Sequence, residues 1–218
     1  MLRENLSHLF QTLPQSVTLV AVSKFHSTEK ILQAYDMGQR IFAESRVQEL
    51  LSKQAELPKD IIWHMIGHLQ TNKVRSIVPF ISLIQSVDSK RLLECIDREA
   101  EAVQRRISCL LEVHVTEEES KTGWNAEDLL EYARSGEWNH LKNVEFSGLM
   151  GMATLTVDQS VIRNDFSRMH SLFEDLRDIF GENFKTLSMG MTDDYALAIE
   201  EGSTMVRLGS LIFGPREY

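Results

Sequence analysis

The chain has 218 residues, of which 43% are hydrophobic and 25% charged, and its formal net charge is -9. This composition is typical of a folded globular protein and excludes a disordered segment. The acidic balance, without a block of Lys or Arg, argues against a nucleic-acid-binding face and against an anionic-membrane patch, because both need clustered positive charge.

Targeting and redox signals point to the cytoplasm. Residues 1–15 lack the apolar core of a secretory signal, and no apolar run is long enough to span a bilayer, so we expect no membrane contact. Cys95 and Cys109 are too few and too isolated for a disulfide scaffold or a Cys-x-x-Cys site. We expect both to be reduced, buried thiols.

Short apolar runs alternate with stretches of helical period along the whole chain. A helix is expected first, over about residues 2–13. Eight strands are then predicted at residues 17–22, 40–42, 61–66, 83–85, 107–115, 144–150, 184–189 and 205–208. Helices are predicted between them at residues 28–37, 89–105, 126–134, 160–180 and 193–201.

This alternation predicts a parallel sheet, since parallel strands need crossover connections and those are usually helices. Eight such units favour a closed (β/α)8 TIM barrel over an open sheet. The chain contains only four prolines and no Ser/Gly-rich linker between its halves. We therefore predict one barrel domain over residues 1–218, with residues 1–15 forming an N-terminal helix outside the barrel.

Lys24 directly follows the first predicted strand, at the barrel end where functional groups gather. A lysine of ordinary pKa is almost wholly protonated at neutral pH, so a Schiff-base lysine must be desolvated or lie beside another cation. A barrel mouth can supply such surroundings. The alternative is a solvated lysine at a strand end.

A phosphate site is predicted by the loops after the last two strands, where barrels often bind phosphate. Ser188 and Thr192 offer hydroxyls, and Gly209 with Ser210 follows the final strand. The two aspartates after Thr192 would repel a dianion, so we place phosphate on Ser188 and on Gly209–Ser210. For Thr192 the alternative is a plain helix cap.

Arg207 lies inside the last predicted strand. Its guanidinium either enters the barrel with a strong acceptor, such as a pyridine nitrogen, or forms a structural ion pair. His64, His68 and His114 lack the spacing of a zinc site, so we expect no metal. Gly-rich dinucleotide and P-loop patterns are absent from the sequence.

Several motifs together resemble one family. They are AVSKF at residues 21–25, WHMIGHLQTNK at 63–73, ESKTG at 119–123, LSMGMTDDYALAIEEGSTMVRLGS at 187–210 and IFGPREY at 212–218. Their combination resembles the pyridoxal 5'-phosphate homeostasis protein family, whose fold is that of the alanine racemase N-terminal domain. The similarity covers nearly the whole chain.

The resemblance implies a barrel, usually monomeric, that holds pyridoxal 5'-phosphate as an aldimine on Lys24. By the same resemblance, Ser188 and Gly209–Ser210 would bind the phosphate, and Arg207 would face the pyridine nitrogen. A guanidinium there disfavours a protonated ring, which makes the cofactor a weaker electron sink.

The chain departs from the family pattern after its second strand. The family usually has Phe-Gly-Glu-Asn and an aromatic residue, whereas residues 42–46 read Phe-Ala-Glu-Ser-Arg. Ser45 can still donate one hydrogen bond to the cofactor, and Arg46 adds a charge near the mouth. His114 stands where the family commonly has Asn.

The expected function is a carrier or buffer of the cofactor, which affects amino- and keto-acid balance indirectly. Cofactor-dependent apoenzymes are the expected recipients, and no catalytic residue is assigned. The first alternative is a weak amino-acid racemase; against it, the β-rich second domain of alanine racemase, with its catalytic tyrosine, has no counterpart here. The second alternative is a cofactor-free Schiff-base aldolase acting on a phosphorylated sugar.

Overall fold

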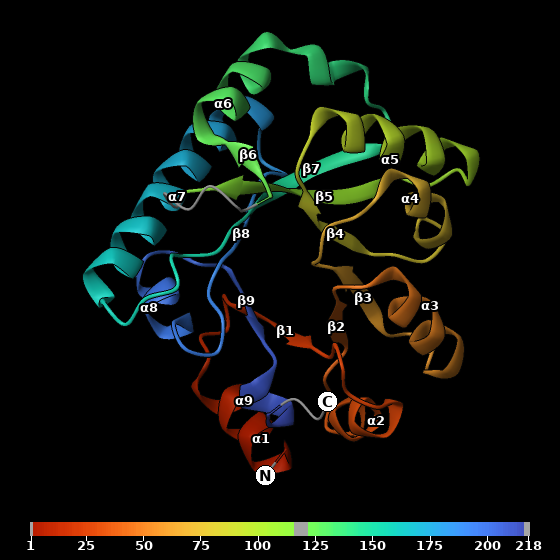
Figure 1. Cartoon of the computed structure of the whole chain (residues 1–218), viewed down its shortest axis with the longest axis vertical. Coiled ribbons are helices and arrows are strands. Elements are labelled where there is room, and N and C mark those ends of the chain that lie inside the picture. Colours follow the sequence, from red (N-terminus) through yellow and green to blue (C-terminus); the bar gives the residue numbers. More distant parts are fainter. Residues whose placement is uncertain (1, 116–121, 216–218) are drawn as a thin grey trace.

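The computed structural model describes residues 2–115 and 122–215 and contains a closed parallel β-barrel surrounded by helices (Figure 1). Going round the ring, the strands are β1 (Thr18–Val22), β2 (Ile41–Glu44), β3 (Ile62–Met65), β4 (Leu83–Val87), β5 (Ile107–His114), β7 (Val144–Met150), β8 (Thr186–Ser188) and β9 (Met205–Leu208). β9 pairs with β1 and closes the ring. The predicted TIM-barrel fold is confirmed.

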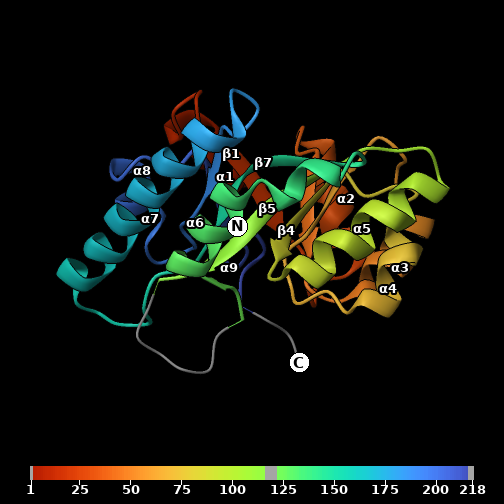
Figure 2. The same cartoon turned by 90° about the horizontal axis from the view of Figure 1, so that it is seen from above.

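Helices cover the outside of the strands, with α2 to α5 on one side and α6 to α8 on the other (Figure 2). Their bounds are α1 (Leu2–Thr12), α2 (Thr28–Asp36), α3 (Val47–Glu56), α4 (Thr71–Ile77), α5 (Lys90–Ala102), α6 (Ala126–Ser135), α7 (Gln159–Phe180), α8 (Tyr195–Glu200) and α9 (Ser210–Phe213), with a 3-10 turn η1 (Glu137–His140). None of the helices in the described ranges is both long and apolar enough to cross a membrane.

The predicted element bounds need small corrections. The helix expected to reach residue 105 ends at Ala102, because Gln104 adopts a left-handed φ of 53° that no α-helix continues through. The helix expected from residue 193 begins at Tyr195, after a turn. β6 (Trp124–Asn125), which pairs with β5 outside the ring, was not predicted. Residues 119–121 and 216–218 of the family motifs lie outside the described residues.

The barrel interior is apolar at one level and polar at another. One apolar side chain from each of six strands forms the inner cluster: Val20, Ala43, Leu83, Leu110, Met150 and Met205. Nearer the carboxyl ends, Gln85 and Arg207 are also buried inside. A larger apolar cluster packs the strands against the helices. The interior is therefore filled with side chains, and ligand sites in such barrels lie at the carboxyl-end mouth.

Closure of the ring brings the first strand and the last strand side by side, and with them the turns that follow these strands at the mouth. Val20 pairs with Arg207 across β1 and β9. The approach is close at the strand ends, because a Cβ on Gly209 would lie 3.2 Å from the Val22 carbonyl oxygen. The turn that carries Lys24 thus lies next to the turn that carries Ser210.

Candidate functional site

A pocket of about 270 Å³ opens at the carboxyl ends of the strands. Most of the predicted site residues line it: Lys24, Thr192, Arg207, Gly209 and Ser210. Apolar side chains complete the wall, among them Val22, Ile66 and Met150. A mostly apolar cavity with a few converging polar groups is the usual form of a small-molecule site.

Lys24 is the second residue after β1, in a turn that returns the chain to α2. The side chain is half-buried in the pocket wall. The turn is fixed by main-chain hydrogen bonds from Ser23 N to Ala43 O (3.0 Å) and from His26 N to Ser23 O (3.1 Å). The His26 ring stacks on Phe213 with centroids 4.9 Å apart, which ties the turn to α9.

Arg207 is a buried cation in the pocket wall, with only 4% of its surface exposed. Its NH1 donates to Ser188 O (2.7 Å) and to Ser188 Oγ (2.8 Å), and its NH2 donates to Gly151 O (2.9 Å). No salt bridge joins it to any carboxylate in the described parts of the chain. Burial lowers the pKa of Arg207 to about 10, and the nearby Asp194 and Glu112 oppose that change, so it stays charged at neutral pH.

A chain of hydrogen bonds crosses the barrel behind Arg207. Because a guanidinium can only donate, Ser188 Oγ accepts from Arg207 and donates its own proton to Gln85 Oε1 (2.7 Å). Gln85 Nε2 then donates to His64 Nδ1 (2.9 Å). Burial lowers the pKa of His64 to about 3, so the ring is neutral and can accept. The direction of every bond is therefore set by Arg207.

Ser188 and Ser45 are placed differently from the other predicted site residues. Ser188 is fully buried, and Arg207 and Gln85 use its hydroxyl, so it lies behind the pocket wall and supports Arg207. Ser45 is half-buried after β2, where a Cβ on Gly67 would lie 2.3 Å from its carbonyl oxygen. Neither side chain lines the pocket. Their expected contacts with phosphate and cofactor stay predictions.

The hydroxyls of Ser210 and Thr192 form the polar side of the pocket near the β9 end. Ser210 Oγ donates to Thr192 Oγ1 at 3.2 Å. The Asp194 carboxylate is turned away into its own loop, where it accepts from Met191 N (2.6 Å). Asp193, however, lines the pocket and is exposed. The two hydroxyls could donate to a bound anion, whereas the Asp193 carboxylate would repel one.

Sequence reasoning missed Gln85 and His64. Gln85 is the one amide side chain in the apolar strand β4, and a polar side chain inside such a strand indicates a buried hydrogen-bonding partner. His64 was weighed only as a metal ligand. Within the two described ranges, no group of three His, Cys, Asp or Glu side chains could hold a metal ion.

The sequence matches known proteins over its whole length. The family model for the alanine racemase N-terminal domain matches residues 1–217. The pyridoxal phosphate homeostasis protein of Pasteurella multocida is 36% identical over 226 residues, covering 100% of this chain and 95% of that protein. The protein of the same name from Synechocystis is 39% identical over 212 residues, covering 96% of each. The chain belongs to the pyridoxal phosphate homeostasis protein family.

Solved structures agree with this family membership. PipY of Synechococcus elongatus, solved with PLP bound, has a TM-score of 0.91 and 38% identity and covers 98% of this chain and 100% of that one. Alanine racemase of Clostridium difficile has a TM-score of 0.81 at 13% identity and covers 100% of this chain and 60% of that one, so it shows the shared fold alone. The family resemblance inferred from the motifs is confirmed.

Proposed function

We propose that this protein binds pyridoxal 5'-phosphate covalently through Lys24 and serves as a cytoplasmic carrier and buffer of that cofactor. The observation that supports this proposal most directly is that an amine, Lys24, and a buried guanidinium, Arg207, line one pocket together with two hydroxyls. The relatives' name and the PLP-bound PipY structure support the same ligand.

The chemistry of the pocket residues suits the parts of the cofactor. Arg207 has N–H groups beyond those given to Ser188 and Gly151, and these suit a pyridine nitrogen. Ser210 and Thr192 can donate to phosphate oxygens. Because a guanidinium does not release its proton to the ring, it weakens the ring as an electron sink. This favours storage over racemisation.

When bound, the cofactor supplies an aldehyde carbon that an amine captures reversibly with loss of water. Apolar side chains, including Val22 and Met150, line the same pocket as Lys24 and would pack against a bound ring. Reversible capture suits a carrier, since water or a competing amine can release the cofactor. We further propose that the protein acts as a monomer and passes the cofactor to dependent apoenzymes, which alters amino- and keto-acid balance indirectly.

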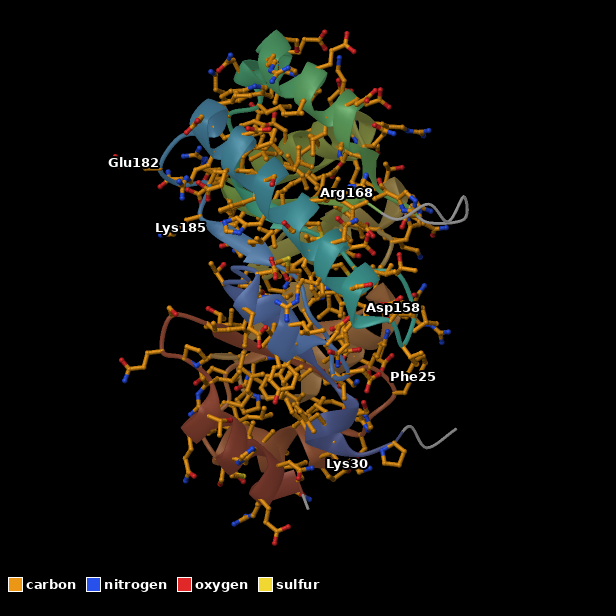
Figure 3. The ribbon with its side chains drawn as sticks, turned by 90° about the vertical axis from the view of Figure 1, so that its left-hand side faces the viewer. Phe25, Lys30, Asp158, Arg168, Glu182 and Lys185 are labelled. Carbon is orange, nitrogen blue, oxygen red and sulfur yellow. The ribbon has the colours of Figure 1, made fainter. Side chains whose placement is uncertain are left out.

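The test is covalent loading of Lys24. Purified protein incubated with pyridoxal 5'-phosphate should gain a visible absorption band that borohydride abolishes, and peptide mass spectrometry should find the reduced pyridoxyl group on Lys24. Lys24→Ala should lose the adduct. Lys185→Ala is the matched control, since Lys185 lies at the opposite end of the barrel from Phe25, the neighbour of Lys24 (Figure 3).

Other outcomes would redirect the proposal. A pyridoxyl adduct that borohydride still fixes to the protein in Lys24→Ala would show that the covalent site is another lysine. Steady racemisation of alanine or serine that disappears in Lys24→Ala would favour the racemase. A protein that takes up no cofactor would contradict the proposal and favour the cofactor-free aldolase.

A further inference from the structure

A cluster of buried charges lies behind the Lys24 turn, on the side away from the pocket. Lys53 Nζ of α3 lies 2.8 Å from Glu44 Oε1 at the end of β2 and 2.6 Å from Glu49 Oε1. Glu44 is fully buried and Lys53 is 5% exposed. We name Glu44, Glu49 and Lys53 the clamp.

Removing these charges from water costs free energy. Because well-packed apolar residues often stabilise a fold equally well at such positions, a buried ion pair is weak evidence that its role is to stabilise the fold. Lysine and glutamate are almost never fully buried unless paired. Burial raises the pKa of Glu44 to about 6, although Lys53 and Ser23 oppose that change. The role of the clamp is indicated by the atoms that it contacts on both sides of Lys24 and by the strained backbone conformation of Phe25.

The clamp contacts the residues on both sides of Lys24. Before it, Lys53 Nζ donates to Ser23 O (2.8 Å), and Ser23 Oγ donates to Glu44 Oε1 (2.6 Å). After it, Phe25 N donates to Glu49 Oε1 (2.7 Å). Two of these hydrogen bonds hold main-chain atoms, Ser23 O and Phe25 N, and the third holds the Ser23 hydroxyl, so the clamp fixes the chain on both sides of Lys24.

The backbone in this turn needs such support. Phe25 has a φ of +66°, in the left-handed region that side chains larger than glycine adopt only when their surroundings impose it. The Glu49 carboxylate holds the N–H of this same residue. Arg46 lies over the Phe25 ring, 5.0 Å from its centroid, and covers the turn from the outside.

We propose that Glu44, Glu49 and Lys53 are positioning residues that hold residues 23–25 in the strained turn and thereby direct the Lys24 amine into the pocket. The proposal rests on the proposed function only for the aldehyde that Lys24 captures. The effect of the clamp on the turn itself does not depend on that ligand.

The first measurement is hydrogen exchange of the turn in protein without cofactor. Glu49→Gln and Lys53→Met should each lose protection in the peptide that contains residues 23–26. The matched controls are Glu56→Gln and Lys59→Met, because Glu56 accepts from Ser52 and Lys59 donates to Gln54 O and Ala55 O, all on or beside α3 and away from the turn. Unchanged protection in both clamp variants would overturn the proposal.

The second measurement is the rate of covalent uptake of pyridoxal 5'-phosphate, compared with the affinity for pyridoxamine 5'-phosphate, which carries the ring and the phosphate without the aldehyde. The clamp variants should capture the aldehyde roughly ten- to hundredfold more slowly, the range expected when a reacting group is misplaced by about 1 Å. Their pyridoxamine 5'-phosphate affinity should stay near that of wild type, because those contacts come from other loops.

The outcomes separate this inference from the proposed function. If a variant loses hydrogen-exchange protection in the turn but takes up pyridoxal 5'-phosphate at the normal rate, the proposed positioning role of the clamp is wrong. An equal loss of uptake and of pyridoxamine 5'-phosphate affinity would also overturn it, since that is general damage to the pocket. If wild type takes up no cofactor, the proposed function fails, and hydrogen exchange still decides whether the clamp exists. Should Lys53→Met not fold, Glu49→Gln decides, because the Glu49 side chain is 22% exposed and easier to replace.

Discussion

Glu112 is a carboxyl inside the barrel that the proposed function does not use. It belongs to β5, is 5% exposed, and accepts from Thr122 Oγ1 at 3.3 Å. Its Oε2 has no hydrogen-bond partner among the residues that the structure describes. Burial raises its pKa to about 7, the nearby Asp88 adds to this rise, and Thr122, Arg207 and His68 oppose it.

This pKa makes stability depend on pH in a defined direction. The folded protein binds the Glu112 proton more tightly than the unfolded chain does, so stability falls as pH rises from the ordinary pKa of 4.5 to about 7. Glu112→Gln removes the ionisable group and keeps the shape. We expect it to raise the free energy of unfolding at pH 8 by about 1–3 kcal/mol, and to change it little at pH 5.

Urea unfolding of both proteins at the two pH values checks this expectation. Glu131→Gln, on the exposed surface of α6, is the control and should change stability little at either pH. A pH-independent difference between Glu112→Gln and wild type would mean that the Glu112 carboxyl does not titrate differently on folding.

The residue-level site was only partly readable from the sequence. Lys24 and Arg207 stand out because a charged side chain follows or interrupts an apolar strand. The role of Ser188 does not stand out, since its partner Gln85 lies 103 residues away along the chain. The role of the clamp could not be predicted for the same reason, because Lys53 lies 30 residues after Ser23, to which it donates.

At the scale of elements, the pairing of β7 with β8 depends on a glycine. Gly148 has a φ of +151°, and a Cβ there would lie 1.7 Å from the Thr186 carbonyl oxygen. Gly148 pairs with Thr186 in the ladder, so the strand backbones cannot separate there without loss of hydrogen bonds. β8 carries Ser188, which supports Arg207.

Gly148→Ala should therefore destabilise the protein by about 3 kcal/mol or more, from overpacking and backbone strain together. Gly181→Ala is the control, since Gly181 has a φ of +86° and a Cβ added there would meet no atom within 4 Å, so the strain alone should cost about 1–2 kcal/mol. Chemical unfolding gives both values. Equal costs would show that β7 and β8 can move apart to accept a methyl group.

Elements were predicted where the sequence carries a local signal. The strands of the ring are buried and therefore appear in the sequence as apolar runs; in β4, for example, every residue is buried. α3 and α4 were expected only from the repeat of βα units and received no bounds, because Arg46 and Gln70, which precede them, are not capping residue types that mark a helix start. β6 has two residues and, among the described strands, pairs with β5 alone, so no periodicity could indicate it.

At the scale of the whole molecule, the sequence predicted the number of βα units and therefore a closed barrel. It did not predict which polar side chains meet inside that barrel. Eight βα units lead to closure because open edges are then paired. Closure is what brings β1 beside β9 (Figure 1). It thereby places Lys24 and Ser210 in one pocket. The polar chain from Arg207 to His64 needs the diameter of the closed ring, and a linear sequence does not encode that distance locally.

Ligand binding at the point of closure should stabilise the entire fold, because the pocket takes residues from both ends of the chain and exists only when the ring is closed. A ligand at 100 times its Kd adds about 2.7 kcal/mol to the free energy of unfolding. For a chain of this length we therefore expect pyridoxal 5'-phosphate to raise Tm by roughly 5–10 °C. Scanning calorimetry measures this directly.

Lys24→Ala separates the covalent and noncovalent parts of that stabilisation. It should show a smaller rise in Tm at the same cofactor concentration, since of the proposed contacts only the noncovalent ones, to Arg207, Thr192 and Ser210, would remain. Inorganic phosphate at the same concentration should shift wild type less than the cofactor does, because it uses the hydroxyls alone. A cofactor shift no larger than the phosphate shift would mean that the ring and aldehyde gain nothing from the pocket, and that the phosphate alone links the cofactor to the closed barrel.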